Sequence, residues 1–313
     1  MVPIHLLNLI STPIPVLNSL GLELSVGLSS DDPIAGRRPS EPYMAYLSLY
    51  SPEGKWLERR TLGEIPPSRR RLFGLSAITR QCVPTGDHLA VVHRVPTRMV
   101  NQVQSLDEPL EMERAPDYSM WRSLIQYSYP SRGNGSVIYE TPPRLNVRKA
   151  GAPPSTTLTF SSKMVFSSEV KTYVVPIHYS MDPGYSSACR YHYLIFDPEG
   201  RQVLNRTVIL PAFTVQALDL PRELSAETIR QATDPKDGLA TFTFVAYSNE
   251  AALAPLILNI APNLGGVSVE HTHPAQAFLM PFDDKDKNRM KGAAIAAWQD
   301  KTAGGGKGVS RVG

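Results

Sequence analysis

Cysteine is scarce in this sequence, and the few cysteines present form no pattern. Cys82 and Cys189 lie in different halves of the chain and in no Cys-x-x-Cys spacing. A disulfide-stapled scaffold or a structural zinc site needs closely spaced cysteines, so the spacing argues against both. A reducing compartment is the simpler expectation. We expect a cytoplasmic location, with a peripheral position on a membrane complex as the alternative.

A strong charge of either sign and a long apolar run are also missing. The net charge is only +3, and the densest basic run, Arg69 to Arg71, is not interleaved with aromatic residues, so no nucleic-acid partner is expected. No stretch approaches the roughly 20 consecutive apolar residues that cross a bilayer. The apolar residues 1–20 contain several prolines and lack a positive n-region, so they do not match a secretory signal.

Motifs that carry catalysis or bind a cofactor are absent from the sequence. It contains no P-loop, no Rossmann fingerprint, no nucleophile elbow and no His-Glu-x-x-His pair. Either cysteine would need a base and an orienting group to act as a nucleophile, and no spacing identifies them. We therefore predict no catalytic residues and no cofactor, and we expect that the chain is not an enzyme.

Proline, in contrast, is abundant. The chain has 28 prolines, well above the usual share of about 5%. Proline interrupts helices and central strands, so the excess indicates many turns and edges. The apolar fraction of 42% and the charged fraction of 19% are those of a globular protein. Short β-patterned runs between turn residues predict an all-β fold of the sandwich or barrel type, without choosing between them.

Several short landmarks occur twice in the chain, in the same order. The pairs are Ser51–Gly54 with Asp197–Gly200, Arg60–Thr61 with Arg206–Thr207, Gly86–Ala90 with Asp237–Ala240, and residues 135–143 with residues 265–274. The first pair places Pro and Gly where a tight turn prefers them, so each copy contains a hairpin. The order predicts two tandem β-sandwich-like or barrel-like domains from an internal repeat. The one helical signal inside the repeat is short and lies near Ser225–Ala232.

The predicted organisation follows from the repeat. It comprises an apolar leader at 1–20, a first domain at 21–147, a linker at 148–162, a second domain at 163–281, and a C-terminal helix with a Gly-rich tail at 282–313. The first copy is longer between matching landmarks than the second. The extra residues predict an acidic insertion near 99–121, and long loops of this kind are common binding sites.

Candidate contacts with other protein subunits lie mainly at the two ends. The partner-binding candidates are Leu6, Leu7, Arg69, Arg70, Arg71, Met290 and Trp298. Met290 and Trp298 share one apolar stripe of the predicted C-terminal helix, a spacing that suits docking into a groove. The leader has three open alternatives: packing on its own domain, contact with a partner, or peripheral contact with a membrane.

One short segment has the pattern of a metal site. His271 and His273 would point to the same face of a strand, and with the preceding Gly265 the segment resembles the first motif of the cupins. That resemblance implies a metal-dependent enzyme on a β-barrel. The cupin carboxylate that should follow is missing, and the matching segment of the first copy, Glu140 to Pro143, has no histidine. We therefore predict that purified protein contains no stoichiometric transition metal.

Three functions are consistent with these patterns. The leading hypothesis is a non-catalytic scaffold or interaction subunit of a larger assembly, with an extrinsic subunit of a membrane-bound energy-transducing complex as a specific case. The first alternative is the cupin-like enzyme. The second is a carbohydrate- or ligand-binding module, whose aromatic platform would use Trp121, Tyr127 and Tyr129.

Overall fold

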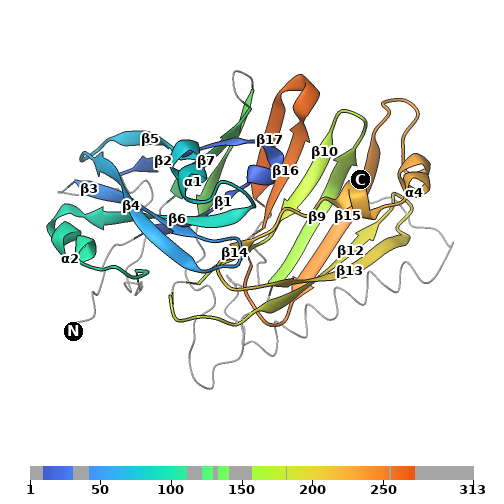
Figure 1. The fold of residues 1–313 in the computed structure, drawn as a ribbon. Coiled ribbons are helices and arrows are strands. Elements are labelled where there is room, and N and C mark those ends of the chain that lie inside the picture. The colour runs from blue at the N-terminus through green and yellow to red at the C-terminus, as the bar shows by residue number, and fades with distance from the viewer. Residues whose placement is uncertain are drawn as a thin grey trace.

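The computed structural model describes residues 10–30, 42–110, 122–129, 133–140, 157–180, 182–253 and 255–271 (Figure 1). This part of the chain is mostly β and forms several antiparallel sheets, as the proline content and the strand patterns predicted. None of the helices in these ranges is long and apolar enough to cross a membrane.

Two four-stranded sheets come from the first half of the chain. Sheet A has the order β1 (Ile10–Val16), β6 (His88–Pro96), β3 (Tyr43–Tyr50) and β4 (Trp56–Ile65). Sheet B has the order β5 (Arg70–Gly74), β2 (Glu23–Ser29), β7 (Arg122–Ser128) and β8 (Asn134–Glu140). The chain moves between the two sheets several times, so neither sheet is a simple meander.

The second half of the chain supplies the remaining sheets. Sheet C has the order β13 (Gln202–Leu210), β12 (Cys189–Phe196), β15 (Ala240–Ser248) and β9 (Thr157–Phe166). Sheet D has the order β10 (Lys171–Val175), β16 (Leu256–Ala261) and β17 (Gly266–His271), and a small sheet E pairs β11 (Ile177–His178) with β14 (Thr214–Val215). In Figure 1 the strands of sheet D lie in the middle of the molecule.

Two segments expected to lie outside the domains contain strands. Strand β1 begins at Ile10 within the expected leader, and strand β9 begins at Thr157 within the expected linker. Leu17 of the leader is buried in the core. The described part of the leader therefore packs on its own domain, the first of the three alternatives.

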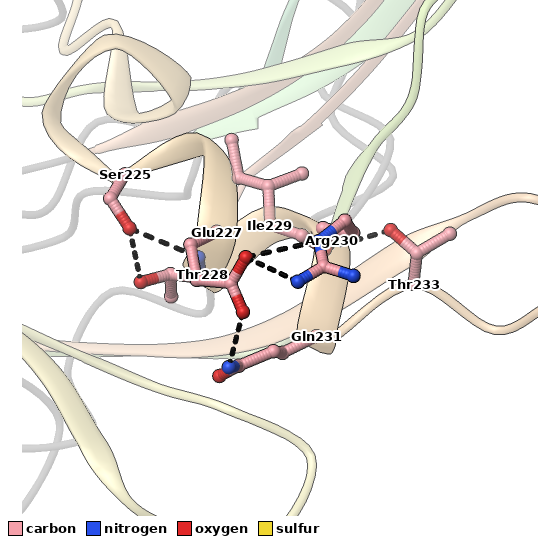
Figure 2. A network of polar contacts seen from close by, with 7 residues as sticks. All are labelled: Ser225, Glu227, Thr228, Ile229, Arg230, Gln231 and Thr233. Atoms are coloured by element: carbon pink, nitrogen blue, oxygen red, sulfur yellow. Dashed lines mark hydrogen bonds and ion pairs between the residues drawn. The ribbon is translucent and has the colours of Figure 1, made fainter.

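The helices are short. They are α1 (Ser76–Cys82), α2 (Val100–Gln104), α3 (Leu220–Glu223) and α4 (Ala226–Gln231), with 3-10 turns η1 (Asn18–Leu20), η2 (Thr97–Met99) and η3 (Pro262–Leu264). Helix α4 confirms the predicted helical segment. Figure 2 shows why it forms: the Ser225 hydroxyl accepts the Thr228 N–H at 3.0 Å, and Glu227 accepts from Arg230 and Gln231 one turn later. This polar network is a helix cap rather than a site.

The first core lies between sheets A and B. On β2, buried residues alternate with half-buried ones, so Leu24, Val26 and Leu28 point inward while Ser25 and Gly27 point outward. The second core lies between sheets C and D and is rich in aromatic side chains such as Phe242 and Phe244. The alternation at Phe242 and Phe244 is the period-2 pattern that places both rings on one face of β15.

The first core does not stop at the boundary between the halves. It continues onto one face of sheet D through Tyr173, Val175 and Leu258, while Val174 and Ile257 point into the second core. Sheet D is therefore packed on both faces, which explains the nearly continuous apolar sequence of β16. The two units share this core, and the shared layer joins them without an intervening layer of solvent.

Two close approaches fix the junction between the units. The turn after β3 abuts the second unit, because a Cβ added to Gly54 would lie 2.0 Å from the Ala212 carbonyl oxygen. Beside it the Tyr50 and Phe213 rings stack with centroids 4.9 Å apart. Strands β8 and β17 also meet: a Cβ on Gly135 would lie 2.5 Å from the Val267 carbonyl oxygen. Glycine in a strand allows this backbone approach.

Candidate functional site

The predicted basic cluster lies at the start of β5, the edge strand of sheet B, with Arg69 directly before the strand. The chain reaches this strand through a tight turn in which Ser68 has a positive φ of 56°. Ser30 fixes the turn: its N–H donates to the Arg69 carbonyl at 3.1 Å, and its hydroxyl donates to the Pro66 carbonyl at 2.8 Å. The start of β5 is therefore held firmly against the end of β2.

The three arginines of the cluster differ in their contacts. Arg71 is engaged within the unit, because its guanidinium donates to the Glu64 carbonyl at 2.7 Å and lies 4.8 Å from the centre of the Phe73 ring. Arg69 and Arg70 are exposed and have no ion-pair partner among the described residues. Within the cluster, and counting partners among the described residues, Arg69 and Arg70 therefore have guanidinium groups that can bind a carboxylate of another molecule.

An exposed apolar side chain lies beside the arginines. Leu72 is 57% exposed, although neighbouring Phe73 is buried in the first core. Leu72 lies opposite Gly27 on β2, which in turn lies opposite Leu124 on β7, so the row across the outer face of sheet B is apolar and lacks a large side chain at its centre. We name the strip of Arg69, Arg70 and Leu72 the basic edge. It combines positive charge, an exposed apolar side chain and a strand whose outer edge pairs with no described strand.

A Ser–His–Ser arrangement occurs in sheet A, but it is buried. The Ser11 hydroxyl lies 2.5 Å from His93 Nδ1, and His93 Nε2 lies 2.8 Å from the Ser48 hydroxyl. Burial lowers the pKa of His93 to about 3, with the nearby positive charge of Arg59 acting in the same direction. All three side chains are nearly inaccessible to solvent, so this group is a neutral structural network that no substrate reaches.

Neither cysteine has the surroundings of a nucleophile. Burial, followed by the Glu58 carboxylate, raises the pKa of the Cys82 thiol. Burial also raises the pKa of the Cys189 thiol to about 12, although its sulfur lies 3.6 Å from His178 Nδ1. A thiolate is the reactive form, so both groups are inert at neutral pH.

The predicted metal candidates are only partly within the described residues. His271 ends β17, where its backbone lies opposite Leu256, and His273 lies outside the described residues. Among the described residues, no group of at least three His, Cys, Asp or Glu side chains is placed to hold a metal ion. The absence of a bound metal from the purified protein stays a prediction.

Several other predicted residues have no described structure. Leu6, Leu7, Met290, Trp298 and Trp121 all lie outside the described residues. Of the predicted aromatic platform, Tyr127 is fully buried and its hydroxyl donates to the Pro15 carbonyl at 2.7 Å. It is a core residue and is not available to stack on a sugar.

The acidic insertion is partly described, and that part is packed. Val103 and Leu110 cover Tyr46 and Val95 on the outer face of sheet A. Arg59 secures the segment by donating to the Val103 carbonyl at 2.7 Å, to the Glu108 carbonyl at 2.9 Å and to the Leu106 carbonyl. Residues 99–110 are therefore a cover for sheet A. The rest of the insertion lies outside the described residues.

Sequence reasoning missed Leu72 and the side chains of the shared core. The arginine run identified the basic cluster, but nothing local indicated that β5 lies at an edge. An edge position depends on which distant strands pair, so composition and spacing carry no signal for it.

Comparisons with known proteins add little. No protein-family model matches the chain, and no curated protein matches it. A glycosyl hydrolase family 2 member from Bacteroides cellulosilyticus matches at 7% identity with a TM-score of 0.19, over 83% of this chain and 25% of that chain. A putative β-galactosidase from Bacteroides fragilis matches at 9% identity with a TM-score of 0.18, over 83% and 32%. This chain thus spans a third or less of their length, and similarity this weak supports no inference about function.

Proposed function

We propose that the chain is a non-catalytic scaffold subunit of a larger protein assembly, in which two joined β-units hold their binding surfaces in a fixed geometry. The observation that carries this proposal is the shared core. Tyr173, Val175 and Leu258 of sheet D pack into the same core as sheets A and B. Inter-domain contacts are usually small and polar and permit motion, whereas a continuous apolar core opposes it. A rigid pair of units suits a protein that positions other subunits.

The strand order of the sheets supports an origin of the two units by internal duplication. Sheet A has the order β1-β6-β3-β4, and sheet C, followed from its other edge, has the order β9-β15-β12-β13. Sheet B contains β2-β7-β8 where sheet D contains β10-β16-β17. Leu218 forms a bridge with Val174 of β10, the position that β5 takes beside β2.

The two proline turns support the same origin. In each turn the N–H of the first residue donates to the carbonyl of the residue after the glycine. The distance is 2.7 Å from Ser51 to Lys55 and 3.0 Å from Asp197 to Arg201. The N–H groups of Gly54 and Gly200 donate to the carbonyls of Ser51 and Asp197, each at 2.9 Å. These two glycines have φ of 84° and 81°. Matching geometry at the predicted landmark is what a duplication requires.

A β-bulge accompanies each turn at the corresponding place. The β3–β4 ladder shifts register between Leu49 and Tyr50, and the β12–β13 ladder shifts between Ile195 and Phe196. Bulges are retained within families as features that bend an edge strand. Their equivalent positions favour common descent of the two hairpins over chance similarity of two turns.

The proposed partner contacts are the basic edge and, outside the described residues, Leu6, Leu7, Met290 and Trp298. Native purification under mild conditions, followed by mass spectrometry of co-purifying chains, tests the proposal. We expect the chain in a complex larger than its own 34.5 kDa with at least one companion in fixed stoichiometry. Elution as a monomer with no companion would contradict the scaffold function.

A further inference from the structure

Most strand edges in the described part are blocked against pairing with another chain. Strand β1, at the edge of sheet A, contains Pro13 and Pro15, which have no N–H to donate. The edge strands β4 and β9 lie in ladders with register shifts along the strand, whereas the β12–β13 ladder shifts only beside its turn. Irregular ladders of this kind twist an edge away from incoming strands.

The edges in the middle of the molecule are occupied. On β10 the Leu218 N–H donates to the Val174 carbonyl at 2.9 Å, and α3 follows directly. Strands β8 and β17 lie against each other, with the Gly135 backbone close to the Val267 carbonyl. These edges are buried within the molecule and are closed to a partner.

Strand β5 is protected neither by a proline or a register shift nor by a described neighbour at its outer edge. Its ladder with β2 runs from Ser25 opposite Gly74 to Ser29 opposite Arg70 without a register shift, and the strand contains no proline. No described strand pairs with its other edge. The backbone of β5 therefore offers a regular edge to which an extended segment can add.

The side chains of the edge select the occupant. A second copy of this chain paired through β5 would bring Arg69, Arg70 and Arg71 of both copies onto one seam, where like charges repel. A segment with carboxylates would instead meet Arg69 and Arg70 as ion pairs. An apolar side chain of the same segment would cover the exposed Leu72.

We propose that the basic edge binds an extended acidic segment of a partner subunit as an additional strand of sheet B. This partner class rests on the proposed scaffold function. Main-chain hydrogen bonds to β5 supply affinity. Arg70 and Leu72 are two residues apart and share one face of the strand, so they select an acidic and an apolar residue that are also two positions apart, and a second acidic residue beside the first meets Arg69.

The test uses the full-length protein and two synthetic peptides, one containing the segment Val-Thr-Asp-Asp and one containing Val-Thr-Lys-Lys, so that the apolar residue lies two positions from the first charge. Fluorescence anisotropy should give binding of the acidic peptide that weakens as salt is raised, and no measurable binding of the basic peptide. Amide hydrogen exchange should show new protection in Arg70–Gly74. No binding of the acidic peptide, equal binding of both, or protection confined to another edge would overturn the proposal.

Charge-reversal variants make the assignment specific. The double variant Arg69→Glu/Arg70→Glu should weaken binding of the acidic peptide by about tenfold or more, because both substitutions place a repulsive charge at the contact. Arg222→Glu is the matched control, an exposed arginine on α3 whose loss should leave binding unchanged. Both variants should melt like the parent protein, since the changed side chains are exposed. Equal weakening by both, or by neither, would contradict the assignment.

The same double variant separates this inference from the proposed function. If every companion subunit still co-purifies in the parent stoichiometry with Arg69→Glu/Arg70→Glu, none of them is held through the basic edge, while the scaffold function stands. If no companion purifies even with the parent protein, the scaffold function fails, and the peptide experiment alone decides whether β5 accepts a strand.

Discussion

His93 lies between two serine hydroxyls in sheet A, and its charge state depends strongly on the fold. Burial holds its pKa at about 3 in the folded protein, against an ordinary value near 6.5. Burial also lowers the pKa of His88 and of His178. In all three the unfolded chain takes up protons at a higher pH than the folded chain does.

The sign of the pH dependence follows from this difference. Above about pH 6.5 neither state binds the proton, so the contribution of His93 to the free energy of unfolding is constant. Below that pH the unfolded state is protonated first, and stability falls by about 1.4 kcal/mol per pH unit until the folded pKa is reached. Urea unfolding at pH 7 and pH 5 should therefore show a loss, and His93→Gln should reduce that loss. An unchanged pH dependence in the variant would mean that His93 is charged in the fold.

Gly54 and Gly200 occupy the same place in two matching turns but have different neighbours. Both have a positive φ, so alanine at either position costs about 1–2 kcal/mol. An added Cβ meets the Ala212 carbonyl at 2.0 Å in Gly54→Ala, and meets nothing within 4 Å in Gly200→Ala. We expect Gly54→Ala to lose about 1–3 kcal/mol more than its control in denaturant unfolding, because of the overpacked junction. Equal losses would mean that the turn does not touch the second unit.

At the scale of elements, the segment 99–110 depends on one side chain. Arg59 donates to carbonyls of Val103, Leu106 and Glu108, and burial lowers the pKa of its guanidinium. Removing it leaves these acceptors without their donor at the point where the segment covers sheet A.

Arg59→Met should therefore loosen this cover. Amide hydrogen exchange in residues 100–110 should rise well above that of the parent, and the free energy of unfolding should fall by about 2–3 kcal/mol. Arg60→Met is the control on the same strand, since the Arg60 side chain is exposed and pairs with Glu58 at 2.8 Å. Unchanged exchange in the Arg59 variant would show that apolar packing by Val103 and Leu110 is sufficient.

Elements governed by local chemistry were predictable from the sequence. The two Pro-Glu-Gly turns, the alternation in β15 and the cap of α4 each depend on residues close together in the chain, and each is present. Strand pairing depends on residues far apart, so the edge position of β5 and the paired faces of sheet D could not be read from the pattern. For the candidate site, the sequence identified the arginines but missed Leu72 for the same reason.

At the scale of the whole molecule, the sequence predicted two domains joined by a linker, and in the described residues the two units share a core. Val174 and Val175 illustrate the difference, because Val175 points into the first core and Val174 into the second. Strands β10 and β16 carry buried apolar residues on both faces. The pattern of a strand that is buried on both faces is visible in the sequence, but the identity of what covers each face is not.

The central claim is that the two units form one rigid body, and differential scanning calorimetry of the full chain tests it most directly. A shared core predicts a single unfolding transition whose calorimetric enthalpy equals its van't Hoff enthalpy, because neither unit can unfold without exposing the core of the other. Two separate transitions, or a calorimetric enthalpy about twice the van't Hoff value, would contradict the account and indicate two independent domains on a linker.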